Sequence, residues 1–175
     1  MSRFEIGVWV VGAVLLFWSV GAYNRLVALR NAIVRGFDAI DAACLERRAL
    51  LDQQVDAASA VLVQASPRLE ALRAANRQLE AARAHARAHP GAKGAIASLK
   101  LAEDVLSDAR ARVPIATASG SEIAALSARI AEHDTALEFA RRQFNGAVTA
   151  YNAAVRQVPT RLIAAVFGFS TAGTL

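Results

Sequence analysis

The sequence has 175 residues, of which 55% are hydrophobic and 20% are charged, and its formal net charge is +5. Much of the hydrophobic share is alanine, and with only four prolines and ten glycines the composition favours an all-α protein over a β-sheet protein. The positive charge forms no basic run and is not interleaved with aromatic residues, which argues against nucleic acid as a partner.

The N-terminal segment is predicted to be a membrane anchor. No charged residue lies between Ile6 and Ala22, a length at the lower limit for a helix that crosses a bilayer. Aromatic residues near the ends of a span prefer the headgroup level, and three stand near these ends: Trp9, Trp18 and Tyr23. The apolar stretch is longer than that of most signal peptides, and Glu5 dilutes the positive charge before it. We therefore expect residues 1–22 to be a retained transmembrane helix.

The charges around the span predict its orientation. Arg3 and Glu5 precede it, whereas three arginines follow it closely: Arg25, Arg30 and Arg35. The excess of positive charge after the span places the N-terminus outside and the remaining chain in the cytoplasm. The single cysteine, Cys44, suits a reducing compartment, and we expect it to be a core residue and not a nucleophile.

The helix of the anchor is predicted to continue to about residue 65. Apolar residues recur at steps of three, four and seven from Leu26 to Leu62, and no proline occurs before Pro67. Two shorter helices are expected next, over residues 67–88 and 95–112, separated by a Pro-Gly turn.

The last long helix is predicted over residues 122–158. Its apolar positions follow a heptad repeat, which is typical of two helices that pack along a common seam. The small residues Ala147 and Ala154 on this seam would let a neighbouring helix approach closely. Residues 23–159 are therefore expected to form an elongated antiparallel bundle of about four helices.

The helix lengths predict an uncovered stalk next to the membrane. The two shorter helices are about half as long as the long ones, so the membrane-proximal half would hold two helices only. A two-helix stalk cannot cover both of its apolar sides. We expect a homo-oligomer in which the following residues pack in the stalk or between copies: Ile33, Phe37, Phe144, Ala147, Tyr151 and Ala154.

Residues 160–175 are predicted to be an apolar tail that lies next to the membrane. It contains five large apolar residues: Leu162, Ile163, Val166, Phe167 and Phe169. The apolar run is too short to span a bilayer, and Arg156 and Arg161 beside it suit anionic lipid. We expect shallow contact with the membrane, so that the domain is fixed to the bilayer at both ends.

The sequence contains no motif for catalysis or for a cofactor. A phosphate-binding loop, a nucleophile elbow, a cysteine cluster and a His-Glu-x-x-His motif are all missing, so we predict a protein without enzymatic activity and without a cofactor. His85 and His89 are spaced for a metal ion but have no third ligand near them in sequence, so no metal site is predicted. His133 on the heptad seam is expected to be a hydrogen-bonded core or interface residue.

Charged residues in the middle of the first long helix are predicted to form a surface ladder with the last helix. The residues of this ladder are Asp38, Asp41, Arg47 and Arg48 on one side and Glu132, Asp134, Arg141 and Arg142 on the other.

Motifs at both ends of the chain resemble the LemA family of small bacterial membrane proteins. They are residues 23–31 (YNRLVALRN), 40–41 (ID), 45–48 (LERR), 140–142 (ARR), 145 (N), 151–155 (YNAAV), 159 (P), 162–164 (LIA) and 167–169 (FGF). The middle of the chain departs from the family pattern, notably at residues 49–54. The resemblance implies a bacterial inner membrane protein with an N-terminal anchor, an elongated antiparallel helical domain and no established enzymatic activity.

Two functions are compatible with these expectations. The first is a membrane-anchored scaffold that self-assembles and organises or shapes the membrane. The second is an adaptor that binds another protein through the end far from the membrane, which we expect around residues 89–94 and 115–121.

Overall fold

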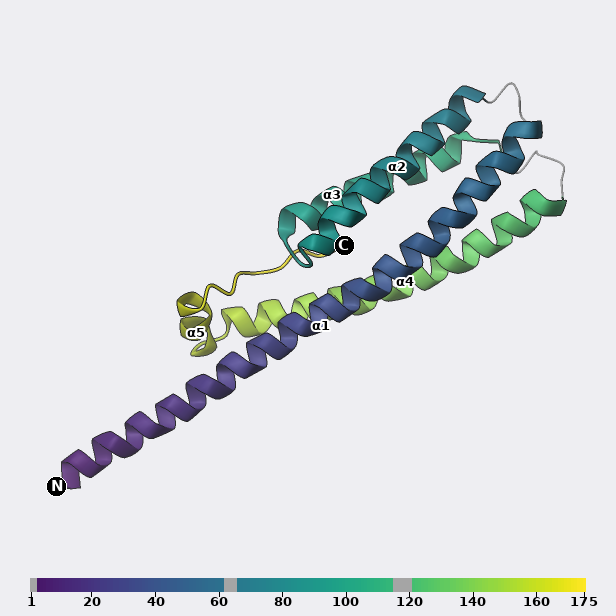
Figure 1. Ribbon diagram of the computed structural model, residues 1–175. Helices are drawn as coiled ribbons and strands as arrows, with labels where there is room; N and C mark the ends of the chain where they lie inside the picture. Colours follow the sequence, from purple (N-terminus) through teal and green to yellow (C-terminus); the bar gives the residue numbers. More distant parts are fainter. Residues whose placement is uncertain (1–2, 62–65, 115–120) are drawn as a thin grey trace.

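The computed structural model describes residues 3–61, 66–114 and 121–175, and in these ranges the protein is all-α (Figure 1). Its helices are α1 (Arg3–Val61), α2 (Ser66–Ala88), α3 (Lys93–Arg112), α4 (Ser121–Arg156) and α5 (Thr160–Val166). No strand occurs in the described ranges. The predicted fold class is confirmed, and α1 runs without a break from the apolar N-terminal segment into the bundle, as expected.

Helices α1 and α4 form an antiparallel pair that is the spine of the molecule (Figure 1). Most heptad positions of α4 are buried: Ile123, Leu126, Ile130, Leu137, Ala140, Phe144, Tyr151 and Ala154. The two other positions within the helix, His133 and Ala147, are half-buried. Val158 lies beyond the end of α4 and is 74% exposed. The predicted seam is therefore confirmed as far as Ala154.

The close approach of α1 and α4 is tightest at Gly36. A Cβ atom at this position would lie 3.3 Å from the Cα atom of Phe144, closer than most such contacts. The glycine lets the two backbones meet here, and the ring of Phe144 then packs edge-on against Phe37 with centroids 6.1 Å apart.

Helices α2 and α3 form a hairpin that lies along α1 and α4 (Figure 1). Because α2 runs back towards the N-terminal end of α1, the turn at residues 89–92 lies on the end of the hairpin that is nearer the predicted anchor, beside Ile33. Gly91 in this turn has a positive φ of 85°, and a Cβ atom there would lie 3.2 Å from Ile33 Cγ2. The expectation that residues 89–94 lie at the end far from the membrane was therefore wrong, and residues 115–120 fall outside the described ranges.

The prediction of an uncovered two-helix stalk was also wrong. Ile33, Phe37 and Phe144 are at most 2% exposed within a single chain. The hairpin covers α1 from Ile33 towards the C-terminal end of that helix. Between Ile33 and the predicted anchor, α5 packs against both α1 and α4. Residues 167–175 then run back to the hairpin turn and complete the cover (Figure 1). These apolar residues therefore need no second copy to bury them.

Candidate functional site

The N-terminal part of α1 projects from the bundle with its apolar side chains exposed. α1 is the one helix in the described part of the chain that is long and apolar enough to cross a membrane. Trp9 is 72% exposed, and Trp18 and Tyr23, nearer the bundle, are each 37% exposed. These features fit a membrane anchor that ends near Tyr23.

Helix α5 lies against α1 where the apolar segment ends. The ring of Tyr23 contacts Phe167 and Phe169, with centroids 4.9 and 5.8 Å apart. Thr160 and Ala164 are the buried residues of α5. The predicted tail residues therefore divide into two groups: Ile163 and Phe169 are half-buried, whereas Leu162, Val166 and Phe167 are exposed.

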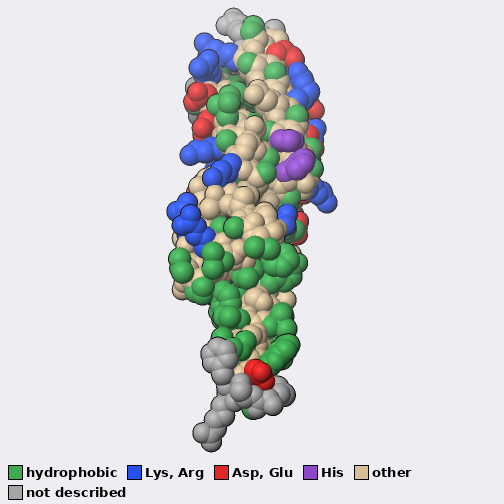
Figure 2. Space-filling model, turned by 90° about the vertical axis from the view of Figure 1, so that its left-hand side faces the viewer, with side chains coloured by type: hydrophobic (Ala, Val, Ile, Leu, Met, Phe, Trp, Pro, Cys, Tyr) green, Lys and Arg blue, Asp and Glu red, His purple; other side chains and the backbone are tan. Residues whose placement is uncertain are grey.

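The exposed apolar side chains around α5 form a surface that we call the collar: Val158, Leu162, Val166 and Phe167, which are 58–76% exposed. Figure 2 shows hydrophobic side chains gathered at the lower end of the molecule, whereas charged side chains are spread over the bundle above. The ring contact of Phe167 with Tyr23 places the collar beside the end of the apolar segment of α1.

Two asparagines of α4 hold the tail against the bundle. Asn152 donates from Nδ2 to the carbonyl oxygen of Ala172 (3.0 Å) and accepts from its N–H (2.8 Å). Asn145 makes the same pair of bonds with Leu175, at 2.7 and 2.9 Å. Seven residues separate the two asparagines, so both face the tail on one side of α4. A further bond joins Gly173 N–H to the carbonyl of Gly91 at 2.9 Å, which ties the tail to the hairpin turn.

Removing the asparagine side chains should release the tail. We expect Asn145→Ala with Asn152→Ala to lower the free energy of unfolding of the tail by a few kcal/mol, because four hydrogen bonds of about 1 kcal/mol each are lost. Amide hydrogen exchange at residues 172 and 175 should become faster. The exposed Asn31 of α1 provides the control, and Asn31→Ala should leave the exchange unchanged. Equal protection of these two amides in the double variant and in Asn31→Ala would contradict the role of Asn145 and Asn152 in holding the tail.

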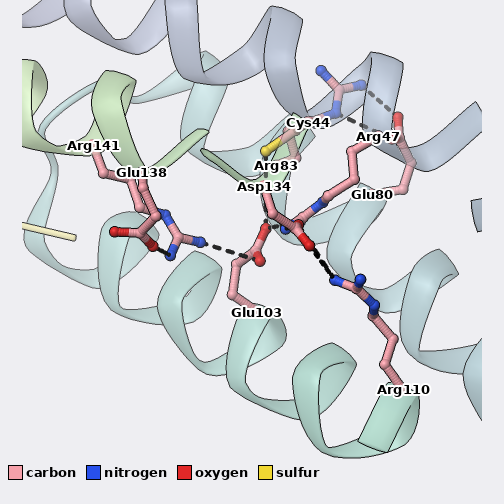
Figure 3. Close-up of polar contacts among 9 residues, drawn as sticks. All are labelled: Cys44, Arg47, Glu80, Arg83, Glu103, Arg110, Asp134, Glu138 and Arg141. Atoms are coloured by element: carbon pink, nitrogen blue, oxygen red, sulfur yellow. Dashed lines mark hydrogen bonds and ion pairs between the residues drawn. The ribbon is translucent and has the colours of Figure 1, made fainter. Parts of the chain in front are cut away.

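A partly buried ion network joins α1, α3 and α4 (Figure 3). Arg47 is only 4% exposed, and its guanidinium lies 2.5 Å from Glu103 Oε1 and 3.2 Å from Asp134 Oδ1. Arg110 pairs with Asp134 at 2.9 Å, and Arg141 with Glu103 at 3.1 Å. Each acid is thus shared between two arginines from different helices.

A second group of ion pairs joins α1 to α2. Asp41 pairs with Arg83, and with Arg87 at 3.1 Å. Arg83 also pairs with Glu80 at 2.5 Å, and Arg48 reaches Glu80 at 2.9 Å. The predicted ladder between α1 and α4 was therefore largely wrong, since of its expected pairs only the one between Arg47 and Asp134 forms.

The protonation states in these clusters follow from burial and from the partners. Burial, together with the nearby Glu103, raises the pKa of the Cys44 thiol to about 11, so the thiol is neutral and unreactive. Burial alone would lower the pKa of Arg47, but the charge of Glu103, its hydrogen bond with Arg47 and the charge of Asp134 together outweigh burial, and the net shift of the pKa is upwards. A hydrogen bond from Arg83 lowers the pKa of Glu80. The clusters thus consist of fixed, mutually paired charges, which hold helices together.

His85 and His89 lie next to each other on α2 and the turn that follows it. The rings of His85 and His89 lie 5.1 Å apart, but within the described ranges no three His, Cys, Asp or Glu residues are grouped to hold a metal ion. His133 Nδ1 lies 3.3 Å from Glu46 Oε2 across the interface between α1 and α4, in agreement with its predicted interface role.

Comparison with known proteins identifies the family. The model of the LemA family matches residues 36–175, which is most of the chain and includes most of the bundle, the collar and the tail. No curated protein and no solved structure gives a significant match. The chain therefore belongs to the LemA family.

Proposed function

We propose that the protein is a non-enzymatic, membrane-anchored scaffold that self-assembles and organises or shapes the bacterial inner membrane. In this proposal the N-terminus lies outside and the helical domain lies in the cytoplasm. The observation that carries the proposal is the collar, an exposed apolar surface beside the point where α1 leaves its apolar segment.

The collar has the chemistry of a surface that enters the headgroup boundary. Burying a large apolar side chain is worth about 1.5–3 kcal/mol, so insertion of the collar would stabilise membrane contact by several kcal/mol. Arg156 and Arg161 line a hollow of about 350 Å³ beside α5. Arginines next to an apolar surface favour anionic lipid, which is abundant on a cytoplasmic membrane face.

Two attachments would fix the orientation of the domain. A single transmembrane helix lets a domain tilt relative to the bilayer, whereas the packing of Tyr23 against Phe167 and Phe169 ties the collar to that helix, so that insertion of the collar would fix the tilt. Every copy would then stand at the same angle to the membrane. A uniform orientation is what a membrane scaffold requires, and it supports this function over that of a flexible tether.

Self-assembly has a candidate contact on α4. Phe139 is 57% exposed, although Leu137 and Ala140 beside it are buried. A large aromatic residue on the surface of a bundle suits contact with a second copy. Mass measurement in mild detergent should therefore give a homo-oligomer, and Phe139→Ser should reduce its size. A monomer would favour the adaptor instead.

Contact of the collar with lipid can be measured by fluorescence quenching. A fluorophore attached at Val166→Cys in a Cys44→Ser background should be quenched by shallow lipid-attached quenchers in liposomes. Val166 is 76% exposed, so its label leaves the ring contact of Tyr23 with Phe167 intact. A label at the exposed position 124, near the far end of α4, is the matched control and should not be quenched. Equal quenching at both positions would rule out the two-point attachment.

A further inference from the structure

A cavity of about 560 Å³ lies between the hairpin turn, the membrane-proximal parts of α1 and α4, and the tail. Its size is within the range of about 300–1,000 Å³ that is typical of small-molecule sites. The hairpin turn provides one wall, and residues 168–172 of the tail provide another. The cavity therefore exists only because the tail is held in place.

The lining of the cavity is positively charged. Arg30 of α1 and Lys93 of α3 contribute two fixed cations, and His89 lies beside them. None of the described residues that line the cavity is acidic. Lys93 is also the first residue of α3, and the N-cap residue Ala92 offers no side-chain acceptor to the free N–H groups of the first turn. The positive end of the α3 dipole thus faces the same space.

Tyr151 supplies an unused hydrogen-bond donor. Its side chain lines the cavity and the residue is only 4% exposed, yet its hydroxyl has no hydrogen-bond partner among the described residues. Burial raises the pKa of Tyr151, while the charge of Arg30 opposes this rise, so the phenol is protonated at neutral pH. The hydroxyl is accessible from the cavity and is free to donate a hydrogen bond to an acceptor there.

We propose that this cavity binds a phosphate-bearing anion, held by Arg30, Lys93 and the hydroxyl of Tyr151. Arg30 is seven residues beyond Tyr23, which is about 10 Å along the helix, so the cavity lies near the headgroup level. The phosphate then comes from a lipid headgroup or from a soluble phosphate ester. This binding site does not depend on self-assembly or on insertion of the collar.

The test uses the full chain in neutral detergent with two probes, phosphatidylglycerol and glycerol 3-phosphate. Native mass spectrometry measures retained lipid, and the shift of the melting temperature measures binding of the soluble ester. We expect Arg30→Gln with Lys93→Gln to weaken binding about tenfold or more, and Tyr151→Phe to weaken it by a smaller factor. The control variant is Arg35→Gln with Lys100→Gln, which removes the same charges from exposed positions of α1 and α3 outside the cavity.

The two probes distinguish the two sources. Retention of phosphatidylglycerol without a response to glycerol 3-phosphate would identify a lipid headgroup, and a response to glycerol 3-phosphate would identify a soluble ester. Both results support the site, provided that the cavity variants lose binding and the control keeps it. If neither probe binds, or if the control loses as much binding as the cavity variants, the proposal is overturned.

Discussion

Replacing Phe144 by alanine should lower the free energy of unfolding by about 3–5 kcal/mol, the usual cost of removing a buried phenylalanine ring. Phe144 is fully buried, it contacts the ring of Phe37, and its backbone lies against Gly36 at the closest point of α1 and α4. The surrounding helices cannot collapse into the space because their backbones already touch there. Chemical unfolding of the full chain in detergent, followed by far-ultraviolet circular dichroism, measures the change.

Leu101 of α3 is the control for this substitution. It is also a large apolar residue, but it is 61% exposed and lies outside the proposed contact between copies. Leu101→Ala should change the free energy of unfolding by no more than about 0.5 kcal/mol. If Phe144→Ala instead reduced the particle mass without changing the free energy of unfolding, Phe144 would lie between copies. That result would contradict the packing of Phe144 within one chain.

The helices and their pairing were predictable because their signals are local and repetitive. The heptad residues from Ile123 to Ala154 recur over many turns, and only a long antiparallel partner, the part of α1 beyond its apolar segment, can cover such a seam. Ser66 at the start of α2 and the turn after Ala88 mark the helix ends by their own chemistry. The lengths of the elements then determine most of the architecture.

The site could not be predicted in the same way, because it depends on contacts between distant residues. The seven-residue spacing of Asn145 and Asn152 shows that they share a face, but nothing nearby in sequence shows that the tail lies on that face. The tail contributes backbone groups, which have no sequence signature. For the same reason the stalk was wrongly expected to be uncovered, and with it Ile33 and Phe37 were assigned to contacts between copies.

The charged residues illustrate a second limit of sequence patterns. Arg47 and Arg48 are adjacent in sequence, yet Arg47 is 4% exposed and the side chain of Arg48 is 37% exposed. A shift of one residue along a helix turns the side chain by about 100°, so one arginine points between α3 and α4 and the other points towards α2. Which face of α1 is buried at Arg47 and Arg48 depends on where the hairpin packs. The local sequence does not show the position of the hairpin.

This contrast between neighbouring arginines predicts a large difference in their effect on stability. Arg47→Met should lower the free energy of unfolding by about 2–3 kcal/mol, because Glu103, whose side chain is 10% exposed, loses its closest cation and keeps only Arg141. Arg48→Met should lower it by at most about 1 kcal/mol, because the pairs of Arg48 with Asp52 and Glu80 are partly solvated. Chemical unfolding of both variants under the same conditions provides the comparison.

A double variant separates the loss of an ion pair from the burial of a carboxylate that has lost its closest cation. Replacing both Arg47 by Met and Glu103 by Leu removes the charges together, and apolar replacements of buried ion pairs are often neutral or stabilising. The double variant should therefore be more stable than Arg47→Met alone, with a coupling free energy of about 1–3 kcal/mol. Since Glu103 belongs to α3, the same coupling measures how strongly the hairpin is held to α1. If Arg47→Met costs no more than Arg48→Met, apolar contacts alone hold the hairpin, and the buried network contributes nothing to its position.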